Sequence, residues 1–253
     1  MVCIPIQAIT KLNKMKIEIT EKQLEGINES LLNEGGIRDI NKLADRFSKA
    51  EIYFHQDLDG VVSALGMKEY LEKYGIEVIG SHVIQYGDKE FSVKKPDASG
   101  DVMPVLVDFA HGKPIFKIHT DHHDSQAGVE DDTSTQFRSA RSNVETISQT
   151  ISPSDIFSNE DIMMINAVDS ADYAKHDIEP QDVMNLIKDF QKGEQPYEKK
   201  WMLGLLTNKL LLSYKNKPGF LEYLVMNSTP SLLNIYQHIT SYAKEKGFAT
   251  PED

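Results

Sequence analysis

Two short runs of β-prone residues stand on either side of one helical stretch, and this order restricts the fold more than any other feature. Residues 51–55 read as a strand, residues 61–74 carry apolar positions at helical spacing, and residues 76–79 read as a second strand. Further strands are predicted at 102–107 and 115–118. Strands that alternate with helices are typical of a parallel sheet with helical crossovers. We therefore predict an α/β fold with a doubly wound, mostly parallel sheet flanked by helices.

The rest of the chain is predicted to be mostly helical. The smaller elements are a helical segment at 20–50, a polar loop at 126–135, and helices at 142–150 and 160–170. Beyond Pro180 every segment reads as helix. We therefore expect an α/β domain over residues 1–180 and a smaller all-helical region over residues 181–253.

The charge balance of the chain is acidic, with 27 Lys and Arg residues against 39 Asp and Glu residues and a net charge of -12. A protein that binds long nucleic acid usually presents a basic face, so this balance weakly favours small phosphorylated partners and leaves long nucleic acid open. Cys3 is the only cysteine, which excludes a disulfide framework and a thiolate zinc site. We find no apolar run long enough to span a membrane and no secretory signal in the first ten residues, so we expect a cytoplasmic protein.

Acidic and imidazole side chains follow three of the predicted strands. His55, Asp57 and Asp59 come after the first strand, Asp108 after the third, and Asp121-His122-His123 after the fourth. Each group has an ordinary explanation, since Asp-x-Asp-Gly often forms a turn and a single Asp often caps a helix. The carboxyl ends of parallel strands meet at one edge, where so many like charges would be costly to bury without cations. Carboxylates and imidazoles without thiolates favour Mn²⁺ or Mg²⁺.

These residues resemble the sequence motifs of the DHH phosphoesterase superfamily. His55-x-Asp57-x-Asp59-Gly60 is similar to the first motif, Asp108 to the second, and Asp121-His122-His123 to the third. A fourth motif is an Asp after a helical stretch, and Asp169 resembles it, with Asp172 as the alternative. The resemblance extends over about residues 50–175. It does not extend to residues 181–253, which lack the Gly-Gly-rich second domain that most members use to hold substrate.

The resemblance implies a two-metal site and assigns roles by position. The implied ligands of two Mn²⁺ ions, or of Mg²⁺, are His55, Asp57, Asp59, Asp108, His122 and Asp169. His123 would face the substrate phosphate or protonate the leaving group, and Asp121 would orient an imidazole. Substrate contacts are expected at a helix start that can seat a phosphate, from Arg138, Arg141, Ser142 and Asn143. The alternative for that segment is a solvated helix start.

The function expected from these roles is hydrolysis of phosphoester or phosphodiester bonds in nucleotides or short oligonucleotides, by a water that two metal ions activate. Three alternatives stay open: a 5′-directed exonuclease on single-stranded DNA, a pyrophosphatase and a non-catalytic scaffold of DHH type. The C-terminal helices can cover the cleft or form the face of a homodimer, and their leucines are expected to form core rather than either surface.

Overall fold

The computed structural model describes residues 40–85, 101–110, 116–124, 135–137, 139–151, 156–171 and 203–248, together with residues 181, 185 and 188. The chain divides into two compact units, residues 1–34 and 35–253, and all described residues belong to the second unit. The first part of the expected helical segment at 20–50 therefore lies outside the described residues. Its last part forms helix α3, Ile40–Arg46.

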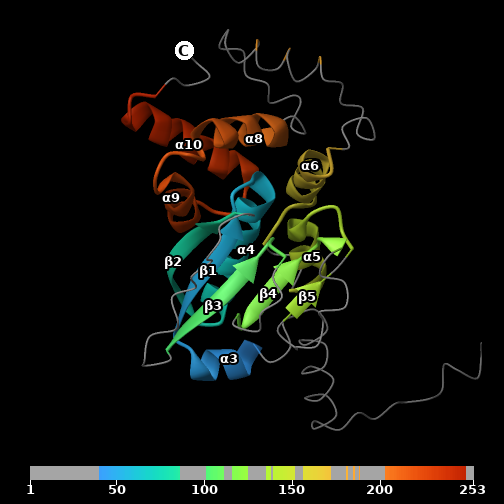
Figure 1. Ribbon diagram of the computed structural model, residues 1–253, viewed down its shortest axis with the longest axis vertical. Coiled ribbons are helices and arrows are strands. Elements are labelled where there is room, and N and C mark those ends of the chain that lie inside the picture. The colour runs from blue at the N-terminus through green and yellow to red at the C-terminus, as the bar shows by residue number, and fades with distance from the viewer. Residues whose placement is uncertain are drawn as a thin grey trace, which may run out of the picture. The chain divides into compact units, whose positions relative to one another are not determined.

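A five-stranded parallel sheet organises the described part of the chain (Figure 1). Its strands are β1 (Lys49–His55), β2 (Glu77–Ile84), β3 (Val102–Val107), β4 (Ile118–Asp121) and β5 (Thr135–Phe137). The strand order is β2-β1-β3-β4-β5. Because β2 lies on one side of β1 and the later strands lie on the other, the winding reverses between β1 and β3, and ligands bind at such switch points in α/β sheets. The predicted α/β class with a parallel sheet is confirmed.

Helix α4 (Leu58–Lys73) packs against β1, β2 and β3, and helix α5 (Asn143–Thr150) packs against β4 and β5. The start of α4 is fixed locally, because the Asp57 carboxylate accepts a hydrogen bond from the Gly60 N–H at 2.9 Å and so caps the first turn. Its apolar side chains, including Val61, Val62 and Leu65, are fully buried against the sheet. The helix ends before Gly75, whose φ of 77° is readily available to glycine.

The remaining described helices are α6 (Asn159–Asp169), α8 (Leu203–Tyr214), α9 (Phe220–Asn227) and α10 (Leu232–Glu245). In Figure 1, α6, α8 and α10 lie beyond the end of the sheet toward which the strands point. Helix α9 packs on β2 and α4, and α8 contacts α4, α6 and α10. The domain boundary expected near residue 180 lies outside the described residues, while the helices after residue 203 belong to the same compact unit as the sheet. Within the described ranges, no helix is both long and apolar enough to cross a membrane.

Several element boundaries differ from the sequence prediction, such as that of β2, which extends to Ile84, and three differences concern the end of the sheet that carries the predicted ligands. Strand β4 begins at Ile118, where the predicted strand ends, because its backbone pairs with Val105, Leu106 and Val107 of β3 regardless of side-chain polarity. Strand β5 overlaps the segment that was expected to be a polar loop, and it is held by pairing with β4. Helix α4 begins three residues before the predicted helix, so that Asp59 and Gly60 lie in its first turn.

Candidate metal centre

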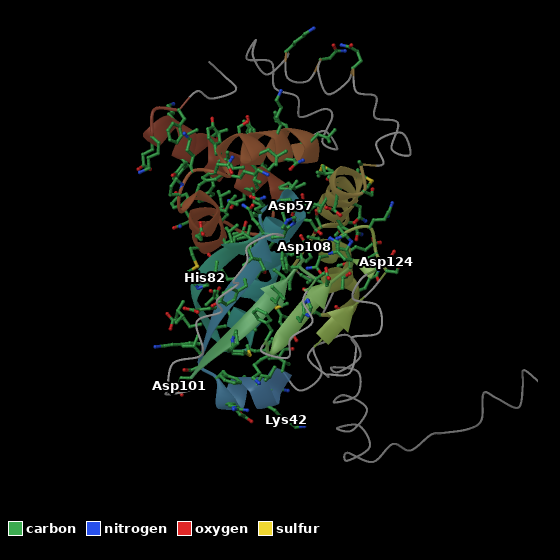
Figure 2. The ribbon with its side chains drawn as sticks, viewed as in Figure 1. Lys42, Asp57, His82, Asp101, Asp108 and Asp124 are labelled. Atoms are coloured by element: carbon green, nitrogen blue, oxygen red, sulfur yellow. The ribbon has the colours of Figure 1, made fainter. Side chains whose placement is uncertain are left out.

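The predicted ligands from the first two motifs lie at the switch point of the sheet. His55 is the last residue of β1, Asp57 caps α4, and Asp108 directly follows β3. In Figure 2, Asp57 and Asp108 are labelled at the same end of the sheet. The parallel register of β1 and β3, in which Phe54 pairs with Val107, explains why side chains so far apart in the sequence meet here.

Gly60 is required by the close approach of α4 to the end of β1. A Cβ atom at this position would lie 2.3 Å from the carbonyl oxygen of His55, far inside van der Waals contact. The missing side chain therefore lets the first turn of α4 fold directly over the strand end. Asp59 thereby lies in the first turn of α4, where it is close enough to Asp57 for the two charges to repel.

The donor atoms of the site form three overlapping groups, each compact enough to hold a metal ion. The groups are Asp108 with His122 and His123, His55 with Asp57 and Asp108, and Asp59 with His122 and Asp169. All six predicted ligands occur in these groups, and His123, which was expected to contact substrate, occurs in one of them as well. Carboxylate oxygens and imidazole nitrogens fit a divalent cation such as Mn²⁺ or Mg²⁺.

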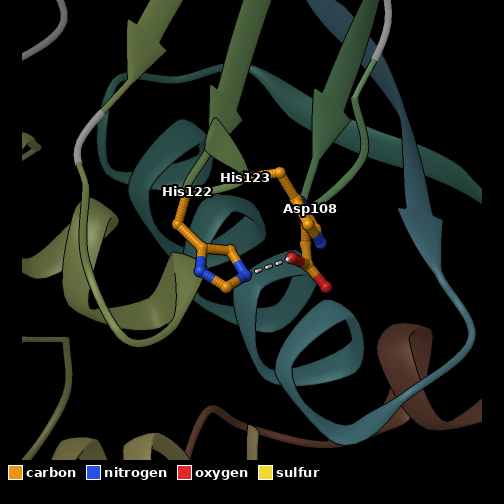
Figure 3. A group of neighbouring side chains, drawn as sticks. All are labelled: Asp108, His122 and His123. Atoms are coloured by element: carbon orange, nitrogen blue, oxygen red, sulfur yellow. Dashed lines mark ion pairs between the residues drawn. The ribbon is translucent and has the colours of Figure 1, made fainter. Parts of the chain in front are cut away.

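The imidazole of His122 points into the carboxylates. Its Nε2 lies 3.4 Å from Asp108 Oδ1, 3.6 Å from Asp59 Oδ2 and 3.5 Å from Asp169 Oδ2. Figure 3 shows the ring directed at the Asp108 carboxylate. Donor atoms that share one cation at about 2.1 Å are roughly 3.0–3.4 Å apart, so these spacings are close to those of a common ion.

The tautomer of His122 follows from its other ring nitrogen. Nδ1 lies 3.2 Å from the carbonyl oxygen of Ala140, which can only accept a hydrogen bond. Nδ1 therefore carries a hydrogen, and Nε2 is the atom that can bind a cation. A backbone carbonyl that fixes an imidazole in this way is the usual support of a metal-binding histidine.

His55 lies much closer to Asp57 than to Asp108. His55 Nδ1 is 2.6 Å from Asp57 Oδ2 and 3.9 Å from Asp108 Oδ2. Burial raises the pKa of Asp57, but its hydrogen bond and ion pair with His55, together with the Gly60 N–H, outweigh burial and leave this pKa below its ordinary value. A cation shared by His55 and Asp57 would need these two side chains to separate by a few tenths of an ångström.

Asp108 lies at the centre of the site in an unfavourable environment. It is buried, and its backbone has a φ of 54°, a left-handed conformation that costs a non-glycine residue free energy. Burial and the charges of Asp59, Asp57 and Asp169 raise the pKa of Asp108 well above its ordinary value. Its Oδ1 atom has no hydrogen-bond partner among the described residues. A cation at this oxygen would relieve both the repulsion and the missing interaction.

Asp169 also lies at an end of its own helix where a negative charge is unfavourable. It is the last residue of α6, where the helix dipole is negative and an acidic side chain is unfavourable. Burial, followed by the charges of Asp59 and Asp57, raises the pKa of Asp169 to about 8. The position is unfavourable for a structural carboxylate and suitable for a metal ligand. Its alternative, Asp172, lies outside the described residues.

Asp121 was expected to orient an imidazole, and its carboxylate contacts the imidazole of His123. Asp121 Oδ1 lies 2.7 Å from His123 Nδ1 and also accepts the His122 N–H at 2.9 Å. The hydrogen bond that His123 donates to Asp121 is the main cause of the raised pKa of His123, against the opposing effect of burial. The His123 side chain is 36% exposed. It therefore combines a raised pKa with access from solvent, which suits a proton donor.

The helix start that was expected to seat a phosphate is occupied instead by Asp59, one of the candidate metal ligands. The N–H groups of Asn143 and Val144 donate to the two carboxylate oxygens of Asp59, at 2.6 Å and 3.0 Å. Ser142 and Asn143 are fully buried, so the open N–H groups that this expectation required are not available there. The role of this helix start is to hold Asp59, because donor groups and a positive helix end stabilise a buried carboxylate.

Arg141, which belongs to the same segment, faces Glu145 and forms no ion pair with Asp59 within the described residues. Arg141 is exposed, and its guanidinium lies 3.7 Å from Glu145. Arg138 lies outside the described residues. A substrate contact by either arginine stays a prediction.

Apart from Ser142, which was expected to contact substrate, several residues that support the site are not recognisable from sequence motifs. Ser142 caps α5 and donates to Asn166 Oδ1 at 2.6 Å, and Asn166 in turn donates to Glu145 at 3.1 Å, which ties α5 to α6. His119 Nε2 donates to the carbonyl of Phe109 at 2.9 Å, next to the left-handed turn at Asp108. The only sequence signal for these residues is polarity at positions where the helical or strand pattern predicts burial.

Comparison with known proteins adds no further assignment, since no protein-family model, no curated protein and no solved structure matches the chain.

Proposed function

We propose that this chain is a Mn²⁺-dependent phosphoesterase of the DHH type that hydrolyses phosphoester bonds in nucleotides or short oligonucleotides. The observation that carries the proposal is the position of the Asp108 carboxylate. Its Oδ1 lies 3.4 Å from His122 Nε2, and its Oδ2 lies 3.9 Å from His55 Nδ1. One carboxylate thus faces two separate donor groups, which is the arrangement expected of a ligand that two cations share.

The donor groups divide into two subsites around Asp108. His55 and Asp57 would hold one ion, and Asp59, His122 and Asp169 would hold the other. When bound, such a pair supplies activation of a water nucleophile and neutralisation of the charge on the phosphoryl group. Carboxylate-rich sites of this kind suit Mn²⁺, and Mg²⁺ is the alternative.

His123 is proposed to protonate the leaving-group oxygen. Asp121 accepts a hydrogen bond from His123 Nδ1 and so holds the imidazole ring of His123. This contact favours the protonated form of the ring. A general acid needs a pKa near the working pH, and a histidine whose pKa is raised by a carboxylate meets this need.

The acidic net charge favours small phosphorylated substrates, and the lone cysteine agrees with a reducing cytoplasm.

The experiment is hydrolysis by the purified chain in Mn²⁺, with a substrate panel of mononucleotides, dinucleotides, cyclic dinucleotides, pyrophosphate and 5′-labelled single-stranded DNA. His122→Ala and Asp57→Ala should each abolish hydrolysis. The matched control is His238→Ala, which removes a partly buried histidine of α10 that belongs to none of the candidate metal-binding groups. Wild-type rates in the His122 or Asp57 variant would show that the site is assigned wrongly.

The same panel separates the alternatives. Processive release from labelled single strands alone would favour the exonuclease, and turnover of pyrophosphate alone would favour a pyrophosphatase. Mn²⁺ binding without turnover of any substrate would favour a non-catalytic scaffold.

A further inference from the structure

A buried polar cluster lies behind the metal centre and joins three elements. It consists of Ser63 from α4, Thr120 from β4 and Asn143 from α5, and none of the three is exposed. The side-chain amide of Asn143 donates to Ser63 Oγ and to Thr120 Oγ1, each at 3.0 Å. Both hydrogens of the amide are therefore used, one toward each of the two other elements. This geometry fixes the three side chains relative to one another.

The cluster is connected to both of the fully buried carboxylates at the centre. The Asn143 N–H donates to Asp59 Oδ2 at 2.6 Å, and Ser63 Oγ lies 3.5 Å from Asp59 Oδ1. On the other side, the carbonyl oxygen of Thr120 accepts the N–H of Asp108 at 2.9 Å. Asn143 thus lies between the carboxylate of Asp59 and the left-handed turn that carries Asp108.

The amide oxygen of Asn143 makes no hydrogen bond within the described part of the chain, so the contribution of this side chain lies in the two N–H groups of its amide. Oδ1 is buried and has no hydrogen-bond partner among the described residues. A buried amide with an unpaired oxygen costs stability, and an apolar side chain of the same shape would avoid this cost. The two donated hydrogen bonds are the feature that such an apolar side chain could not supply.

We propose that Asn143 is a positioning residue of the metal centre, which fixes the carboxylate of Asp59 through Ser63 and the turn of Asp108 through Thr120. This inference rests on the proposed metal centre and gives Asn143 a role other than the substrate contact expected from the sequence. Loss of a hydrogen-bond partner behind a metal ligand typically lowers metal affinity 10–100-fold.

The test measures Mn²⁺ affinity by isothermal titration calorimetry on the full chain, together with thermal unfolding in chelator. Asn143→Leu keeps the backbone N–H and the branched shape of the side chain but removes the two amide donors, and it should weaken Mn²⁺ binding about 10–100-fold. Ser63→Ala is a smaller change that removes the link to Asp59, and it should act in the same direction. If Asn143→Leu does not fold, the Mn²⁺ affinity of Ser63→Ala decides whether the proposal holds.

The matched control is Thr146→Val. Thr146 is buried one turn further along α5, and its hydroxyl has no hydrogen-bond partner in the described part of the chain. This substitution removes a buried hydroxyl outside the cluster and should leave Mn²⁺ affinity unchanged. A purely structural role for Asn143 would lower the unfolding temperature without changing the affinity of the folded protein.

The outcomes separate this proposal from the proposed function. Wild-type affinity in both Asn143→Leu and Ser63→Ala would overturn the role of Asn143 and leave the metal centre standing. If the wild-type chain bound no Mn²⁺, the metal centre and the role of Asn143 would both be wrong. Weakened binding in the two variants, with the Thr146 variant unchanged, supports the proposal.

Discussion

Replacing Asp169 by Asn should make the protein more stable in chelator and less responsive to Mn²⁺. The substitution keeps the size of the side chain and replaces a carboxyl whose ionisation is opposed by burial and by the charges of Asp59 and Asp57. This carboxyl also lies at the C-terminal end of α6, where the helix dipole opposes a negative charge. The carboxylate is useful only if a cation is bound, so stability and metal binding should change in opposite directions.

The size of the effect follows from the raised pKa of Asp169, which is about 8 against an ordinary value of 3.8. At pH 7 the unfolded chain ionises this group and the folded protein does not, so its presence lowers the free energy of unfolding by at most about 4 kcal/mol. Part of the repulsion is shared with the neighbouring carboxylates, and we expect a gain of about 1–4 kcal/mol from the substitution. The unfolding temperature should rise by about 2–4 °C for each kcal/mol.

The pH dependence has a defined sign. A carboxyl whose pKa is raised by folding destabilises the protein above its ordinary pKa, and this loss grows until the raised pKa is reached. The advantage of Asp169→Asn should therefore shrink as the pH falls toward 3.8 and level off above about pH 8.

The assay is thermal unfolding followed by circular dichroism, in chelator and in Mn²⁺. A ligand at 100 times its dissociation constant stabilises a protein by about 2.7 kcal/mol, so Mn²⁺ should raise the wild-type unfolding temperature by several degrees. The variant should gain much less. Asp172→Asn is the control, and it should respond to Mn²⁺ like the wild type.

Two results would refute this reasoning. If Asp169→Asn were less stable than the wild type in chelator, the repulsion inferred for the site would be absent. If Mn²⁺ stabilised it as much as the wild type, Asp169 would not be a ligand. Loss of the Mn²⁺ response in Asp172→Asn alone would move the fourth motif to that residue.

Two further predictions concern the first motif. Gly60→Ala should destabilise the fold by about 1–3 kcal/mol and abolish hydrolysis, because the new Cβ would overlap the His55 carbonyl. The control is Gly80→Ala, whose Cβ would meet Glu51 at an ordinary distance of 3.6 Å. Equal unfolding temperatures for the two variants would contradict this explanation. Mn²⁺ should bind in two steps, with the weaker step at His55 and Asp57, because their 2.6 Å contact must open and the other Asp57 oxygen already caps α4. His55→Ala should remove only the weaker step in a calorimetric titration, and loss of the tighter step would reverse the order.

The convergence of the candidate ligands at one edge could be predicted from the sequence. Short apolar runs such as residues 51–55 and 102–107 are local signals, and the polar residues directly after them mark the strand ends. In a parallel sheet these ends meet, so His55 and Asp108 could be placed together without coordinates. The ordinary explanation for Asp57-x-Asp59-Gly60 was a turn, and in the structure one carboxylate oxygen of Asp57 caps α4.

The tertiary structure alone decided the extent of β4, the existence of β5 and the function of the α5 start. Pairing with β3 draws His119 and Thr120 into β4, and pairing with β5 adds Asp121, although the polarity of these residues indicates a loop. The N–H groups at Asn143 and Val144 read as an open anion seat in the sequence, yet Asp59 occupies both. Helix starts and apolar runs depend on neighbouring residues, whereas the partner of a buried donor can lie anywhere in the chain. Asp59 lies 84 residues before Asn143, and only the folded sheet brings the two together.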